Sequence, residues 1–142
     1  MLNCYMITKI LLPIDGSPFS ERAGEHAIYL AKNLKTQLTA IYVLKVGATK
    51  KLDSEIESIK MKQANLCFSP LKNKATNESV EMETKILVSR SVVKTILEEA
   101  KDGNYDLIVI SPHGLSDLKK LILGSITEEV LKKSTIPVLV TR

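Results

Sequence analysis

Two glycines enclose a short basic loop late in the chain. Gly114 is followed by nine residues and then by Gly124 and Ser125, within the stretch SPHGLSDLKKLILGSITEEV. The residues after Gly124 have the pattern of a helix start, where free amide groups and the helix dipole attract anions. Glycine permits close backbone approach and positive φ angles, and the Ser125 hydroxyl can donate to a phosphate oxygen. Ser125 and Glu128 also match an ordinary S-x-x-E capping box, so the residues alone leave both interpretations open.

Asp15 and His113 are two further polar side chains that could contact a ligand. Asp15 closes the apolar run KILLPID, where a carboxylate can bind ribose hydroxyls or cap the helix that follows. Its charge repels phosphate, so a sugar or base suits it better. His113 precedes Gly114 and can either contact a ligand or simply order its loop. Because neither His113 nor His26 has an evident orienting partner, we identify no catalytic residues.

The cysteines and histidines show no metal-binding pattern. Cys4 and Cys67 lie far apart and form no C-x-x-C motif, and the chain has only 2 His residues. We therefore expect isolated structural thiols and no metal bound by the protein itself.

Strands and helices alternate along the chain and would position these residues. Short, nearly continuous apolar runs predict strands buried on both faces. They cover residues 9–15, 38–44, 105–111 and 137–141. Residues 80–88 instead alternate apolar and charged side chains, which predicts a strand at a sheet edge. Apolar residues at helical spacing predict helices. These cover residues 17–34, 91–104 and 124–134, with Ser17 as the cap of the first.

The polar, lysine-rich segment of residues 45–79 is harder to interpret. Ser54 and Glu57 form a capping signal, and a partial apolar face follows them. We expect a helix there, followed by a frayed or flexible stretch around residues 69–79.

The resulting order, β-α-β-α-β-α-β-α-β, predicts one doubly wound α/β domain over residues 1–142, with a parallel sheet and helices on both faces. Ligands bind such sheets beyond the carboxyl ends of the strands, where the strand order reverses. The candidate residues directly follow or end the strands. They are Pro13, Ile14, Asp15, Val43, Ser111 and Gly114.

Composition excludes several classes of protein. The formal charge of +4 comes from dispersed basic residues without interleaved aromatics, so we expect no nucleic-acid binding. No apolar run reaches the roughly 18–20 residues of a membrane helix, so we expect no membrane partner. The first residues lack the features of a signal peptide, which favours a cytoplasmic protein.

Four segments together resemble the universal stress protein family over nearly the whole chain. They are KILLPIDGS, VISPHG, LGSITEEVLKKS and IPVLVTR. The family's nucleotide motif is G-x-x-G, nine residues, then G-S or G-T, and this chain matches it with Gly114, the full spacing and Gly124-Ser125. The resemblance implies a five-stranded parallel sheet of order 3-2-1-4-5, in which the first and fourth strands are adjacent.

The resemblance also implies a ligand and its contacts. In ATP-binding members, the matching Asp15 would lie near the ribose and adenine, and Val43 would offer its backbone to the adenine. The phosphates, usually with Mg²⁺ carried by the nucleotide, would meet the motif residues and the next amide. These are Gly114, Gly124, Ser125 and Ile126.

The chain departs from the family pattern in the motif itself. Ser111 stands where the motif has its first glycine, and Pro112 stiffens the turn and removes an amide donor. We expect a stress-response regulatory protein that binds ATP or another adenine nucleotide, with at most slow ATP hydrolysis. The apolar last strand would pair with its copy to form a homodimer. The alternative is a nucleotide-free family member that acts as a dimeric protein-interaction module.

Overall fold

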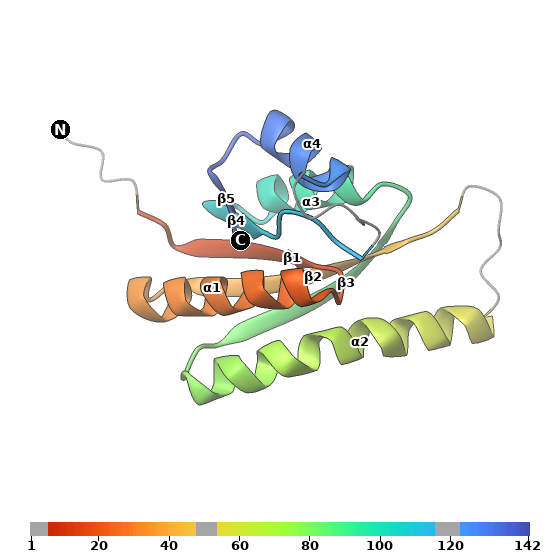
Figure 1. Ribbon diagram of the computed structural model, residues 1–142, viewed down its shortest axis with the longest axis horizontal. Helices are drawn as coiled ribbons and strands as arrows, with labels where there is room; N and C mark the ends of the chain where they lie inside the picture. The colour runs from red at the N-terminus through yellow and green to blue at the C-terminus, as the bar shows by residue number, and fades with distance from the viewer. Residues whose placement is uncertain (1–5, 48–53, 116–122) are drawn as a thin grey trace.

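The computed structural model describes residues 6–47, 54–115 and 123–142. Strands and helices alternate through these residues (Figure 1). In chain order they are β1 (Lys9–Ile14), α1 (Pro18–Leu34), β2 (Gln37–Lys45), α2 (Ser54–Asn77), β3 (Met82–Ser89), α3 (Val92–Asp102), β4 (Leu107–Ile110), α4 (Ser125–Lys133) and β5 (Val138–Val140). All strand pairs are parallel, in the order β3-β2-β1-β4-β5, which confirms the expected topology.

The sheet is the middle layer of the molecule, with α1 and α2 on one face and α3 and α4 on the other (Figure 1). Because side chains alternate across a strand, β1 supplies Ile10 and Leu12 to the first face and Leu11 to the second. All three are fully buried. Burial of each such side chain contributes about 1.5–3 kcal/mol, so β1 forms the centre of both cores.

α2 continues where the sequence predicts a frayed stretch, and that expectation was wrong. The helix runs to Asn77 and includes Pro70, which is exposed. Phe68, Leu71 and Ala75, at helical spacing, are almost completely buried against the α1 side of the core. Their burial compensates for the backbone hydrogen bond that Pro70 removes.

β3 lies at one edge of the sheet, as its alternating pattern predicts. It pairs only with β2 among the described strands, over Leu38 to Lys45. Glu83 and Lys85 are exposed, whereas Met82 and Ile86 pack against the core on the α2 side.

Two cap predictions had different outcomes. Ser17 caps α1 as expected, because its side chain accepts a hydrogen bond from the Ser20 amide at 3.1 Å. At α4, however, the N-cap is Gly124 and Ser125 is the first helical residue, so the predicted capping box is wrong. Glu128 instead pairs with Lys132, one turn further along the helix, at 2.9 Å.

Among the described helices, none combines the length and the hydropathy that a bilayer crossing needs.

Candidate functional site

A cavity of about 100 Å³ lies at the carboxyl ends of β1 and β4, beneath the start of α4. Among its lining residues are all the sequence-predicted site residues except Val43. They are Pro13, Ile14, Asp15, Ser111, Gly114, Gly124, Ser125 and Ile126. Sequence reasoning missed other lining residues from three helices. These are Ser20, Val92, Ile96 and Thr127.

Asp15 joins the two loops that flank the cavity. One carboxylate oxygen accepts a hydrogen bond from the Ser17 amide at 2.9 Å, and the other accepts one from the Leu115 amide at 3.0 Å. The Asp15 amide donates to the Ser20 hydroxyl at 3.3 Å. Asp15 therefore holds the loop after β4 against the start of α1.

Gly114 is required by its closeness to Asp15. A Cβ atom at Gly114 would lie 2.1 Å from an Asp15 carboxylate oxygen, which is far inside contact distance. Gly124 has φ −64°, and Gly114 lies outside the left-handed region as well, so neither position uses the positive φ that glycine permits. The positive-φ glycine of this region is Gly16, at 83°.

Among the described residues, no side chain caps the N-terminus of α4, whose N-cap residue is Gly124. The Gly124 amide donates to the Pro112 carbonyl at 2.8 Å, and the Gly124 carbonyl accepts from the Glu128 amide at 2.9 Å. The amides of the first helical residues, Ser125 and Ile126 among them, have no acceptor within the helix itself. This end of α4 therefore presents amide groups and the positive end of the helix dipole at the cavity.

Thr127 fixes the position of that helix end. Its hydroxyl donates to the Ser111 carbonyl at 2.7 Å, and both residues are buried. A threonine in the first turn of a helix, on its buried side, was the only sequence signal for this contact. The bond joins α4 to the end of β4, so the helix start cannot shift without breaking it.

His113 lies in the same cavity wall and packs against α1. Its ring meets Phe19 edge-on, with centroids 4.1 Å apart and planes at 71°. The side chain is 6% exposed.

Val43 lies outside the cavity lining. It is half-buried within β2 and pairs with Leu87 of β3. It follows Tyr42, whose partner Ile14 is the last residue of β1. Its backbone therefore lies just past the end of β1, where β2 extends beyond its neighbour.

A free thiol lies on the other side of the β1–α1 turn. A Cβ atom at Gly16 would lie 2.6 Å from the Cys67 Sγ atom. Burial raises the pKa of the Cys67 thiol, and the negative charge of Asp15 raises it further. A raised pKa keeps the thiol protonated and unreactive, in agreement with the expected structural role. Cys4 lies outside the described residues.

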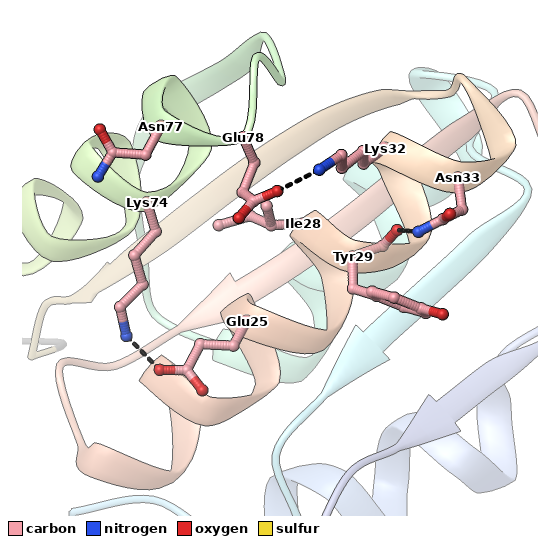
Figure 2. Close-up of a pocket in the computed structure, with 8 residues that line it drawn as sticks. All are labelled: Glu25, Ile28, Tyr29, Lys32, Asn33, Lys74, Asn77 and Glu78. Carbon is pink, nitrogen blue, oxygen red and sulfur yellow. Dashed lines mark hydrogen bonds and ion pairs between the residues drawn. The ribbon is translucent and has the colours of Figure 1, made fainter.

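A second and larger hollow, of about 550 Å³, lies between α1 and the end of α2 (Figure 2). Its charged groups neutralise one another. Lys32 pairs with Glu78 at 2.5 Å, and Lys74 pairs with Glu25 and, at 3.2 Å, with Glu21. A polyanion would have to break these pairs, so this hollow is the poorer anion site despite its size.

No metal site is evident in the part of the chain that the structure describes. There, no three His, Cys, Asp or Glu side chains lie close enough together to hold an ion. A divalent cation at the cavity would therefore need ligands from elsewhere, such as the phosphates of a nucleotide.

The protein is a doubly wound α/β protein, and its cavity lies between the adjacent strands β1 and β4, where the strand order reverses. Open α/β sheets in general bind their ligands at this switch point. The family model described as "Universal stress protein family" matches residues 6–142, and the chain belongs to this family. The resemblance noted in the sequence is thereby confirmed.

Individual relatives agree with this assignment. The chain is 33% identical to universal stress protein YxiE of Bacillus subtilis, over 96% of this chain and 100% of the relative. The solved structure of protein MJ0577 superposes with a TM-score of 0.81 at 28% identity, covering 96% of each chain. The universal stress protein named MJ0577 is from Methanocaldococcus jannaschii. A universal stress protein from Archaeoglobus fulgidus, solved in complex with dAMP, shares the fold with a TM-score of 0.70 at 20% identity, over 97% of this chain and 99% of that one.

Proposed function

We propose that this protein binds an adenine nucleotide, ATP with Mg²⁺, at the carboxyl ends of β1 and β4, and acts as a regulatory protein in the stress response. One observation carries the proposal. The uncapped N-terminus of α4 faces the same small cavity as Asp15 and Gly114. Helix amides without a side-chain cap are available to an anion, and a phosphate is the anion that a nucleotide supplies.

The phosphates bind at the start of α4. The amides of Ser125 and Ile126 and the Ser125 hydroxyl donate to phosphate oxygens, and Gly114 and Gly124 keep the cavity wall free of side chains. No side chain of an N-cap residue competes for these donors. Mg²⁺ enters with the phosphates, since carboxylates are not clustered among the described residues.

The ribose and the base extend past the end of β1. The cavity of about 100 Å³ is smaller than the roughly 300–1,000 Å³ of typical ligand pockets, so it holds only part of a nucleotide. The remainder lies along Pro13, Ile14 and Asp15 towards the backbone of Val43, with Ser111 beside the sugar. The universal stress protein from Archaeoglobus fulgidus that was solved with dAMP supports an adenine nucleotide as the ligand class.

The protein acts as a homodimer in the cytoplasm. β5 is an edge strand whose Leu139 is 40% exposed, and an apolar edge can pair with the same edge of a second copy. Nucleotide binding at the ends of β1 and β4, next to β5, then affects the paired strands.

Calorimetric titration with MgATP tests the proposal. The wild-type protein should bind saturably with about one nucleotide per chain. Gly124→Leu should weaken binding at least tenfold, because a large side chain covers the α4 amides. Circular dichroism of the variant checks that its fold is kept. No heat of binding from the wild type with MgATP, MgADP or AMP would refute the proposed function.

The small cavity also favours a second candidate, a dimeric interaction module that binds no nucleotide. The same titration separates the two, because that module gives no nucleotide binding while it remains a dimer by light scattering.

A further inference from the structure

His113 is a buried polar side chain that lines the candidate cavity. The residue is only 6% exposed. Both of its ring nitrogens are buried, and neither has a hydrogen-bond partner among the described residues. A neutral imidazole carries one N–H donor and one acceptor nitrogen, and burying both without partners destabilises a protein. Most buried polar groups have partners, so this exception calls for a physical reason.

The ring is also held in a fixed place. Phe19 of α1 packs edge-on against it, with the ring centroids 4.1 Å apart. His113 lines the cavity that the α4 N-terminus also lines. Two independent features, the uncapped helix amides and the unpaired imidazole, therefore converge on one small space.

We propose that His113 is a phosphate-binding residue of this site and that its ring donates a hydrogen bond to the phosphate held at the start of α4. This inference rests on the proposed function and deepens it, because it adds a side-chain donor beyond the glycine and serine positions of the motif. The bound phosphate supplies the hydrogen-bond partner that the buried ring lacks among the described residues.

Few ionisable side chains surround this contact. Asp15 and His113 are the ionisable side chains that line the cavity among the described residues. The elements packed around them contribute uncharged side chains. These are Ser20 and Phe19 from α1, Val92 and Ile96 from α3, and Ser125, Ile126 and Thr127 from α4. His113 is therefore the nitrogen-bearing side chain that the described lining offers to a phosphate.

His113→Phe separates a binding role from a structural one. Phenylalanine keeps an aromatic ring against Phe19 but removes both nitrogens. The variant should bind MgATP about 10- to 100-fold more weakly, since a hydrogen bond to a charged group is lost. Its melting temperature without ligand should rise by about 2–5 °C, because two unpaired buried nitrogens are gone. Thr36→Val is the matched control, since it removes another buried unpaired atom, Oγ1, at the opposite end of the sheet and should leave affinity unchanged.

The experiment is calorimetric titration with MgATP and with adenosine, together with thermal melting of the free proteins. Wild type, H113F, H113Q and T36V are compared. H113Q keeps a donor and should bind with intermediate affinity, and it provides the answer if H113F does not fold.

Three outcomes would overturn the inference while the proposed function stands. They are equal MgATP affinity in wild type and H113F, an equal loss of affinity for adenosine, and a lowered melting temperature of free H113F. The second would assign His113 to the nucleoside, and the third would assign it to folding. If the wild type itself binds no nucleotide, the proposed function fails and this inference fails with it.

Discussion

Asp15 and Gly114 show how a single contact determines two residue types at once. The carboxylate accepts from an amide on each side of the cavity, at 2.9 Å from Ser17 and 3.0 Å from Leu115. Such closeness leaves no room for a side chain at Gly114. The sequence motif marks this glycine, but the motif cannot reveal that the neighbour it accommodates is Asp15, near the start of the chain.

Gly114→Ala should therefore destabilise the protein by about 1–3 kcal/mol, since the new Cβ forces Asp15 away from the Leu115 amide. Urea unfolding followed by circular dichroism measures the loss. Gly47→Ala is the control, because no atom lies within 4 Å of a Cβ there and its φ is not positive. A stability equal to that of the wild type would show that the loop after β4 can move aside without cost.

At the scale of helices and strands, periodicity predicted most of the sheet correctly. Continuous apolar runs located β1, β2, β4 and β5, and alternation placed β3 at the edge. The end of α2 was missed because its surface residues dominate the local composition. Phe68, Leu71 and Ala75 are the buried residues there, and their contribution becomes visible only against α1.

The residues of the candidate site could also be predicted in outline from the order of the strands. Strand ends and the glycine spacing identified which residues would meet, because parallel strands bring their carboxyl ends to one edge. The sequence could not show which donors are free. Ser125 matched a capping box, yet Gly124 is the cap, and the unpaired ring of His113 depends on packing by Phe19.

At the opposite end of the sheet, hydrogen bonds to Asp106 join the start of β1 to the start of β4. Asp106 Oδ2 accepts from the Thr8 amide and hydroxyl, both at 2.8 Å, and from the Lys9 amide at 3.0 Å. The bonds from Thr8 lower the pKa of Asp106, and the Lys9 amide lowers it further. A lowered pKa in the folded state means that this contribution is complete above the ordinary aspartate range and is lost as pH falls through the lowered value.

Asp106→Asn should therefore cost about 1 kcal/mol at pH 7, because neutral bonds replace charge-assisted ones at a partly exposed site. The stabilities of the two proteins should converge below about pH 3, where the carboxylate of the wild type is protonated. Urea unfolding at a series of pH values measures this. Asp102→Asn, an exposed change in the last turn of α3, should show no such loss. A difference that persists unchanged at low pH would contradict the role given to the charge.

Across the whole molecule, the two edge strands of the sheet, β3 and β5, differ in the charge of their side chains. β3 carries Glu83 and Lys85 on its exposed positions, and charges of this kind protect an edge from pairing with another chain. β5, by contrast, consists of Val138, Leu139 and Val140 and has no charged residue. The asymmetry makes β5 the edge available for a second copy, next to β4 and hence next to the candidate site.

Leu139→Lys should therefore convert the proposed dimer into a monomer, because a charge on the pairing edge would have to be buried between two copies. Light scattering coupled to gel filtration should give about twice the chain mass of 15.7 kDa for the wild type and a single chain mass for the variant. Val88→Lys is the matched control, since it places the same charge at an exposed site on the other edge strand, β3, and should leave the dimer intact. If both variants remain dimeric, β5 is not the interface, and if the wild type is already monomeric, the paired-edge proposal fails. MgATP titration of the L139K monomer then shows whether each copy binds nucleotide by itself.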